Sequence, residues 1–164
     1  MAVMQTALNW TAAIDDAELK ASVIIVCGGS SSRMNGIDKI FATIGNMPVA
    51  AKTIMAFEAL KEISNIVVVT KEESVLPMQK LCDEYGFKKV TDIVAGGACR
   101  EESVYNGFKM LSSKEQIVLI HDGARPFVTE KVIKDCIETA KTFGSAIPVV
   151  PVRDTIIKKQ QNGN

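Results

Sequence analysis

The sequence predicts an α/β protein built on a doubly wound, mostly parallel sheet with helices on both of its faces. Two observations carry this prediction. Short apolar runs rich in β-branched residues, which are typical of strands buried on both faces, alternate with segments whose apolar residues recur at helical spacing. The helical segments are about ten to fifteen residues long, as expected for the crossover connections that join parallel strands.

The first half of the chain supplies two strands and two helices. We expect a first strand at residues 22–27, followed by a loop rich in glycine and serine. Pro48 is favourable in a first helical turn, so it opens the first helix, whose apolar side is formed by Ala50, Ile54, Phe57 and Leu60. A second strand at residues 65–70 leads to a helix that ends at Gly86 and places Val75, Met78, Cys82 and Tyr85 on one face.

The second half repeats the alternation. A third strand is expected at residues 88–94, followed by a helix with an inner face of Val104, Gly107, Phe108 and Leu111. A fourth strand at residues 116–120 leads to a helix that Thr129 caps and that turns Ile133, Cys136, Ile137 and Ala140 inward. Gly144 ends this helix, and residues 145–150 are expected to form a fifth strand.

Composition excludes several classes of partner. The 164 residues are 47% hydrophobic, enough for one domain with its own core, and 19 basic residues balance 19 acidic ones. We therefore expect neither nucleic acid nor a membrane as a partner, since both need a basic surface or a long apolar span. No secretory leader is recognisable. The four cysteines lack C-x-x-C spacing, so we interpret them as reduced, buried thiols of a cytoplasmic protein.

The loop after the first strand has the composition of a polyphosphate site. Gly28, Gly29 and Ser30 allow backbone N–H groups to approach an anion, while Arg33 and Lys39 neutralise its charge. The loop matches neither G-x-G-x-x-G nor the P-loop pattern, so a plain flexible connection remains the alternative. Val69-Thr70-Lys71 ends the second strand without the acidic residue of a dinucleotide fold, which argues against an NAD-linked oxidoreductase.

Two further loops should meet this one, because ligands of doubly wound sheets lie beyond the carboxyl ends of the strands. Gly96 and Gly97 could lie against a flat base whose edge Ser103 reads, or could form a simple turn. Asp122 could hold Mg²⁺ together with phosphate oxygens, or could be a turn residue. Arg125 could clamp a substrate phosphate or pair with Glu130, and His121 is interpreted as a structural hydrogen-bonding residue.

Four ordered motifs give the chain a resemblance to the 2-C-methyl-D-erythritol 4-phosphate cytidylyltransferases, and to the sister family of ribitol-5-phosphate cytidylyltransferases. The resemblance covers residues 22–158. It rests on GSSSRM at residues 29–34 with Lys39, GGACREESVYNG at 96–107, HDGARP at 121–126 and PVRDT at 151–155. Two departures are mild: Ser31 stands where a second glycine is frequent, and Gly123 where alanine is usual.

This resemblance implies a Rossmann-like nucleotidyltransferase that uses CTP and Mg²⁺ to form CDP-methylerythritol for isoprenoid synthesis. It makes Arg33 and Lys39 catalytic, assigns Asp122 to the metal and the substrate, and places Arg125 and Thr155 by the sugar-alcohol phosphate. It also implies a homodimer, which the shortened chain should form more weakly. Family members run on to supply a further substrate-binding Arg and a second catalytic Lys. A CTP-binding fragment without turnover therefore stays open, as does ribitol phosphate as substrate.

The resemblance and the element pattern together suggest three parts. We expect an N-terminal extension at residues 1–20, a nucleotide-binding α/β domain at 21–152, and the start of a truncated β-arm at 153–164.

Overall fold

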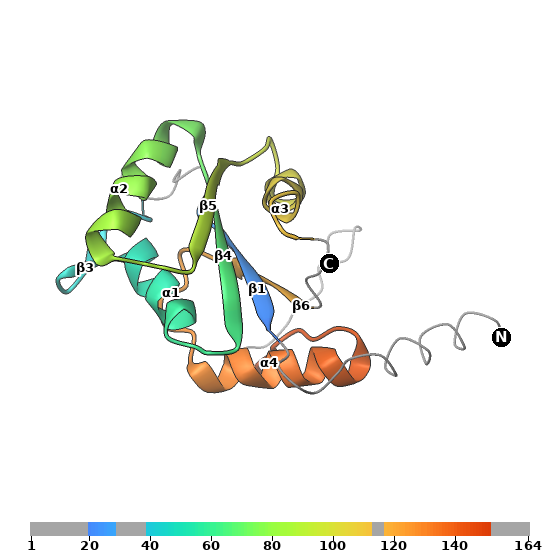
Figure 1. Ribbon diagram of the computed structural model, residues 1–164. Coiled ribbons are helices and arrows are strands. Elements are labelled where there is room, and N and C mark those ends of the chain that lie inside the picture. Colours follow the sequence, from blue (N-terminus) through green and yellow to red (C-terminus); the bar gives the residue numbers. More distant parts are fainter. Residues whose placement is uncertain (1–19, 29–38, 113–116, 152–164) are drawn as a thin grey trace, which may run out of the picture.

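The structure is a computed structural model that describes residues 20–28, 39–112 and 117–151. Its centre is a parallel four-stranded sheet (Figure 1). Its strand order is β5-β4-β1-β6. The strands are β1 (Ala21–Val26), β4 (Ile63–Thr70), β5 (Val90–Ala95) and β6 (Ile117–Asp122). A separate antiparallel pair consists of β2 (Thr43–Ile44) and β3 (Met47–Pro48).

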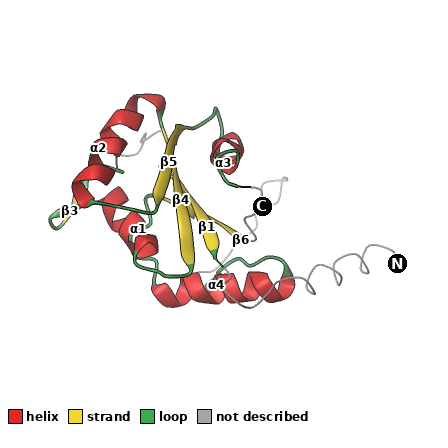
Figure 2. Cartoon of the chain, in the orientation of Figure 1, coloured by secondary structure: helices red, strands yellow, loops and turns green. Residues whose placement is uncertain are grey.

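Helices cover both faces of the sheet, as the sequence predicts (Figure 2). They are α1 (Val49–Glu58), α2 (Val75–Tyr85), α3 (Arg100–Phe108) and α4 (Glu130–Phe143), with a short 3₁₀ helix, η3 (Glu72–Ser74), before α2. Residues of α1, α2 and α4 belong to one apolar cluster, and those at α3 pack against a second cluster. The helix α3 therefore stands alone on its face.

The strand β1 is the centre of the core, and all six of its residues are buried. Val23 and Ile25 pack toward the three-helix face, while Ile24 and Val26 pack toward α3, as the alternation of side chains along a strand requires. Gly107 lets α3 come close to the sheet, because a Cβ there would lie 2.7 Å from Ile24 Cγ2. This buried strand leads directly into the glycine- and serine-rich loop.

The strand order also sets where a ligand can bind. β4 and β6 flank β1, and the chain crosses from β5 on one edge to β6 on the other. The direction of winding thus reverses at β1. A crevice at such a switch point, beyond the carboxyl ends of the strands, is where open α/β sheets bind ligands.

Local sequence signals place most of the elements correctly. The expected helices at Pro48 and Thr129 begin there, and the Thr129 hydroxyl accepts a hydrogen bond from the Val132 N–H. Gly86 ends α2 in a left-handed conformation with φ of 65°, which explains why a glycine stands at that position.

Three expectations are wrong. Residues 145–150 form no strand and Ile147 is 85% exposed, because Pro148 and Pro151 lack the N–H that a strand ladder uses and no neighbouring strand pairs with this segment among the described residues. Phe108 points outward, and Leu111 takes the inner position beyond the end of α3. Cys99 is an exposed capping residue rather than a buried thiol, whereas Cys27 and Cys82 are buried.

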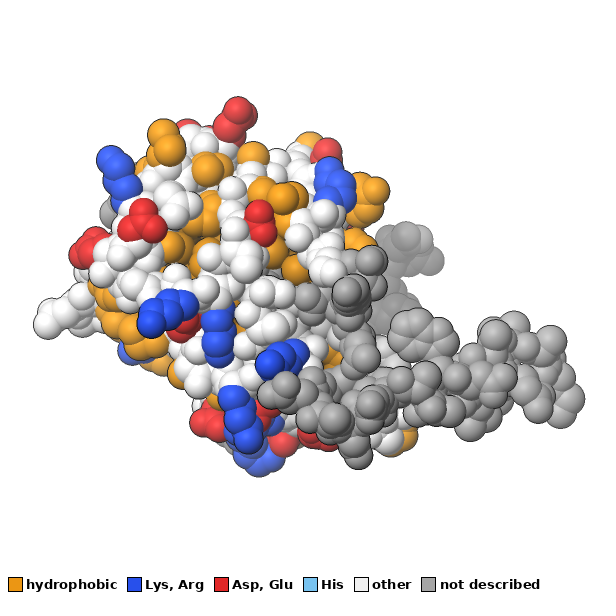
Figure 3. All heavy atoms as spheres, in the orientation of Figure 1, with side chains coloured by type: hydrophobic (Ala, Val, Ile, Leu, Met, Phe, Trp, Pro, Cys, Tyr) orange, Lys and Arg blue, Asp and Glu red, His pale blue; other side chains and the backbone are white. Residues whose placement is uncertain are grey.

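The expected extension at residues 1–20 and the expected arm at 153–164 lie outside the described residues, except for Lys20. None of the helices in the described part of the chain has the length and apolar character needed to cross a bilayer. The face in Figure 3 carries Lys and Arg side chains interspersed with Asp and Glu, in keeping with the balanced composition.

Candidate active site

The carboxyl ends of all four parallel strands meet at one edge of the sheet. Val26 at the end of β1 pairs in register with Asp122 at the end of β6, and Thr70 of β4 pairs with Ala95 of β5. Backbone hydrogen bonds continue these pairings into the loops, from Gly123 N–H to Val26 O at 2.8 Å and from Gly96 N–H to Thr70 O at 2.7 Å. The three motif loops therefore start from one rim, as predicted.

Asp122 is the charged centre of this rim. Its Oδ1 lies 3.1 Å from Arg100 Nη2, at the first position of α3, and its Oδ2 lies 2.9 Å from Arg125 Nη2. The three side chains carry a net charge of +1, and both arginines are more exposed than the aspartate they share. Such a cluster can turn its guanidinium groups toward an anion, because each keeps further N–H donors. The alternative pairing of Arg125 with Glu130 does not occur.

The loop that carries Asp122 and Arg125 is anchored to α1 through the side chain of Thr53. The buried Thr53 hydroxyl lies 2.7 Å from the Gly123 carbonyl oxygen and 3.0 Å from the Val49 carbonyl oxygen, to either of which it can donate its hydrogen. Gly123 also lies against Cys27, the residue that follows β1, and a Cβ at position 123 would come within 2.3 Å of Cys27 Sγ. The loop is thus fixed between the first strand and the first helix.

The segment from Gly96 to Ser103 forms the opposite side of the rim. The Ser103 hydroxyl is buried, accepts a hydrogen bond from the Gly97 N–H at 3.0 Å and donates one to the Cys99 carbonyl oxygen at 2.9 Å. Asn106 donates from Nδ2 to the Ala95 carbonyl oxygen. Ser103 therefore shapes the glycine turn, and one lone pair of its oxygen remains for a ligand.

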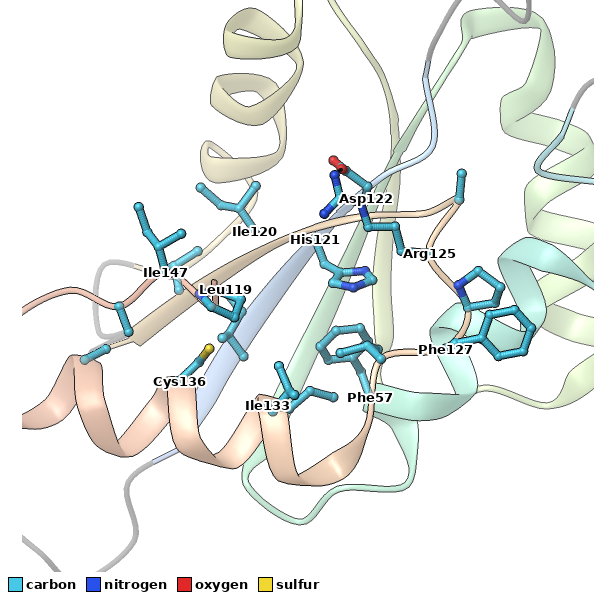
Figure 4. A pocket seen from close by; sticks show the side chains of 18 of the residues that line it. Phe57, Leu119, Ile120, His121, Asp122, Arg125, Phe127, Ile133, Cys136 and Ile147 are labelled. Carbon is cyan, nitrogen blue, oxygen red and sulfur yellow. Dashed lines mark ion pairs between the residues drawn. The ribbon is translucent and has the colours of Figure 1, made fainter. Parts of the chain in front are cut away.

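A groove of about 1440 Å³ begins at this rim and runs down between β6 and α4 (Figure 4). Arg100, Asp122 and Arg125 lie together at its polar end, Lys39 also lines it, and apolar residues such as Leu119, Ile133 and Ile147 line most of the rest. Lys39 thus belongs to the same cavity as the Asp122 cluster. The apolar part lies away from the charged groups, so only the polar end is assigned to the candidate site.

His121 is a packing residue here. Its ring meets Phe57 edge to face with centroids 5.0 Å apart, and its buried Nδ1 has no hydrogen-bond partner in the described part of the chain. The expected structural hydrogen bond of His121 is therefore not made at Nδ1. Burial lowers the pKa of the imidazole below its ordinary value, so the neutral form is favoured near pH 7. The positive charge of the rim comes from arginine and lysine.

The donor set at Asp122 fits a Mg²⁺ ion that arrives with phosphate groups. Among the described residues no group of three or more Asp, Glu, His or Cys side chains could hold a metal ion by itself. Mg²⁺ needs only one or two carboxylates when phosphate oxygens and waters complete its shell. Asp122 can supply one oxygen, provided that Arg100 or Arg125 turns from it to the phosphates.

The structure describes most of the predicted site residues. Gly28, Lys39, Gly96, Gly97, Ser103, Asp122 and Arg125 all lie on the rim or line its groove. Gly29, Ser30, Arg33 and Thr155 lie outside the described residues, so their roles stay predictions.

Three supporting residues were not predicted as site residues. Arg100 lies in the motif GGACREESVYNG, but its partner Asp122 is 22 positions away, and no local pattern points to that pair. Thr53 could have been found from the sequence, because a polar residue on the apolar side of a helix needs a buried hydrogen-bond partner. Glu102 could also have been found, because it stands at the third position of a helix that begins after a glycine turn.

Comparison with known proteins finds a family that the chain matches over most of its length. Residues 21–164 match the profile of the family described as 2-C-methyl-D-erythritol 4-phosphate cytidylyltransferase. The chain is 44% identical over 139 residues to the enzyme of that name from Halalkalibacterium halodurans, covering 84% of this chain and 60% of the relative. It is 42% identical over 145 residues to one from Clostridium botulinum, covering 88% and 63%.

Solved structures agree. The structure of 4-diphosphocytidyl-2C-methyl-D-erythritol synthase from Anaerococcus prevotii superposes with a TM-score of 0.63 and 26% identity, over 74% of this chain and 51% of that one. A second synthase of the same name superposes with a TM-score of 0.67 and 25% identity, over 88% and 66%. The chain thus spans about 60% of the length of the curated relatives it matches.

Proposed function

This chain belongs to the 2-C-methyl-D-erythritol 4-phosphate cytidylyltransferase family, and we propose that its rim binds CTP and transfers the cytidylyl group to 2-C-methyl-D-erythritol 4-phosphate. An oxygen of the sugar-alcohol phosphate attacks the α-phosphorus of CTP. The bond from the α-phosphorus to the oxygen of the β-phosphate breaks, and pyrophosphate leaves with that electron pair. The product is CDP-methylerythritol, an intermediate of isoprenoid synthesis.

The observation that carries the proposal is the Asp122 cluster, with Lys39 in the same cavity, at the switch point of the sheet. Transfer at phosphorus needs positioning and charge stabilisation rather than a protein nucleophile, because the attacking oxygen belongs to the substrate. Two arginines on one carboxylate, with a lysine in the same cavity, suit that demand. The packing of the single histidine against Phe57 agrees with a reaction that asks for no protein base.

Each predicted site residue then has a role. Lys39 and Arg33 stabilise the triphosphate and the charge that develops at the α-phosphorus in the transition state. The loop of Gly28, Gly29 and Ser30 turns backbone N–H groups toward the phosphates. Arg125 and Thr155 hold the phosphate of the second substrate.

The base occupies the other side of the rim, in the pocket of Gly96, Gly97 and Ser103. Asp122 would hold Mg²⁺ together with phosphate oxygens and would also help to bind the second substrate. When bound, the ion neutralises phosphate charge and so lowers the electrostatic cost of bringing two anions together. We propose that the reaction takes place in the cytoplasm, where the thiols of the described cysteines remain reduced.

Nucleotide choice tests the binding half of this proposal. In a calorimetric titration with Mg²⁺ the chain should bind CTP more tightly than ATP, because a pocket of backbone groups around Gly96 and Gly97 suits a single pyrimidine ring. Equal affinity for the two nucleotides would contradict the pyrimidine assignment. The second substrate is tested by comparing pyrophosphate release with methylerythritol phosphate and with ribitol 5-phosphate, of which the first should be used faster.

A second candidate function is CTP binding without turnover. It is favoured by the share of the relatives that this chain spans, about 60%, since residues beyond the matched part could contribute to the reaction. Measurable CTP binding without pyrophosphate release from either sugar phosphate would support it. The expected homodimer also stays a prediction, and light scattering over a dilution series would test it.

A further inference from the structure

The start of α1 is joined to the segment that carries Lys39. The Val49 N–H donates to the Ala42 carbonyl oxygen at 2.9 Å. The Ala50 N–H donates to the Ile40 carbonyl oxygen at the same distance. The first N–H groups of a helix have no partner inside it, so the backbone that follows Lys39 satisfies two of them. The position of Lys39, which lines the groove, is therefore tied to the first turn of α1.

Thr53, one turn further along α1, contacts the loop on the other side of the helix. Its side chain is fully buried, and its hydroxyl lies 2.7 Å from the Gly123 carbonyl oxygen and 3.0 Å from that of Val49. The hydroxyl has one hydrogen to donate, and the Val49 oxygen already accepts the Thr53 N–H within the helix. The buried Gly123 oxygen has no other donor among the described residues, so the hydroxyl hydrogen serves Gly123.

Gly123 is the point at which the charged loop is held. It directly follows Asp122, and its own N–H donates to the end of β1 at 2.8 Å. Two residues further on, the Arg125 N–H donates to the Asp122 carbonyl oxygen at 3.1 Å, and the side chains of these two residues pair at 2.9 Å. Residues 49–53 of α1 thus support both Lys39 and the loop of Asp122 and Arg125.

We propose that Thr53 is a positioning residue, which sets the place of Asp122 and Arg125 relative to Lys39. The inference rests on the proposed function and deepens it, because a phosphate held at Arg125 must reach the α-phosphorus of a nucleotide held at Lys39. Without the hydroxyl, the buried Gly123 carbonyl oxygen loses its donor, and the loop shifts to pair that oxygen with water. A misplacement of about 1 Å between reacting groups costs about 100-fold in rate.

Three variants of the full chain separate positioning from a merely structural role. Thr53→Val removes the hydroxyl and nearly keeps the shape of the side chain, whereas Thr53→Ser keeps the hydroxyl and removes a buried methyl group. Thr142→Val is the matched control, because the Thr142 hydroxyl on α4 also donates to a carbonyl oxygen four residues back, at 2.9 Å, and holds no loop. The measurements are kcat for cytidylyl transfer, the melting temperature, and amide hydrogen exchange at Gly123 and Arg125, followed by NMR.

Thr53→Val should lower kcat by about 10- to 100-fold and speed exchange of the Gly123 and Arg125 amides by at least about fivefold. Thr53→Ser should keep kcat and both exchange rates near those of the wild type, although the loss of a buried methyl group lowers its melting temperature. Thr142→Val should match the wild type in kcat and in exchange. A merely structural role would instead make kcat follow the melting temperature across the variants.

A Thr53→Val variant with the kcat or the exchange rates of the wild type overturns the inference and leaves the proposed function intact. A Thr53→Ser variant as slow as Thr53→Val overturns it as well. A wild-type chain that releases no pyrophosphate from CTP and the sugar-alcohol phosphate contradicts the proposed function, and exchange of the two loop amides then decides by itself whether Thr53 holds the loop.

Discussion

Gly123 lies against Cys27 so closely that a methyl group at position 123 would come within 2.3 Å of Cys27 Sγ and 3.3 Å of Cys27 Cα. Cys27 directly follows β1, and Gly123 begins the loop that carries Arg125. The resemblance places alanine at position 123 in most family members, and the structure supplies the reason for the departure here. The sulfur of Cys27 occupies the space that the methyl group of an alanine would need.

A double-mutant cycle tests this relationship. Gly123→Ala should lower the free energy of unfolding by about 1–3 kcal/mol, because overpacking at a buried contact forces neighbouring atoms apart. Adding Cys27→Ala should restore part of that loss, giving a favourable coupling of about 1 kcal/mol. Urea unfolding of the wild type, both single variants and the double variant measures it. Strict additivity of the two changes would show that the sulfur is not what excludes the methyl group.

Lys39 should matter for turnover more than for stability. It lines the same groove as the Asp122 cluster, so removing its charge should withdraw stabilisation from the transition state. Lys39→Ala should reduce the rate of cytidylyl transfer by roughly two to three powers of ten, with an unchanged melting temperature. Lys131→Ala is the matched control, since Lys131 pairs with Asp135 on the exposed side of α4. Equal rates for the two variants would remove Lys39 from the mechanism.

Asp122→Asn should change the response to Mg²⁺. An amide oxygen carries no net charge, and the variant also leaves Arg100 and Arg125 without their shared partner. The Mg²⁺ concentration for half-maximal rate should rise by at least about tenfold. Asp135→Asn removes a carboxylate of α4 from outside the rim and should titrate like the wild type. Superimposable titrations of Asp122→Asn and wild type would show that Asp122 does not serve the metal.

Alkaline pH should weaken the fold through Cys82. Burial raises the pKa of this thiol from 9.0 to about 11, so the native state holds its proton more tightly than the unfolded chain does. Its stabilising contribution is complete below pH 9 and is lost as the pH rises toward about 11. Urea unfolding across this range should show a steeper fall for wild type than for Cys82→Ala. Cys99→Ala, which removes an exposed thiol, should follow the wild type; a Cys82→Ala curve parallel to both would contradict the assignment.

Much of the fold could be predicted because its signals are local. Buried β-branched runs, the proline that precedes α1 and the glycine that ends α2 act within a few residues of where they stand. Residues 145–150 have the same apolar, β-branched character and still form no strand, because a strand exists only with a partner, and because Pro148 interrupts the segment and Pro151 follows it. The predicted inward position of Phe108 is also wrong. The helix α3 ends at Phe108, and Leu111 packs inward from the turn beyond it.

The candidate site, like the fold, could be predicted only in part from the sequence. Sheet topology brings the three motif loops to one rim, and that much follows from the alternation of strands and helices. The pairing of Asp122 with Arg100 and the hydrogen bond from Thr53 to the Gly123 carbonyl oxygen join residues that lie 22 and 70 positions apart in the sequence. No spacing rule encodes such contacts.

The proposed transfer of a cytidylyl group can be followed by ³¹P NMR of a single reaction. The full chain is mixed with CTP, Mg²⁺ and 2-C-methyl-D-erythritol 4-phosphate, and Lys39→Ala is run in parallel. The proposed transfer should give equal amounts of pyrophosphate and of a new diphosphate diester, both dependent on the sugar-alcohol phosphate and both strongly reduced in the variant. Pyrophosphate that appears at the same rate without the second substrate, or no pyrophosphate at all, would contradict it.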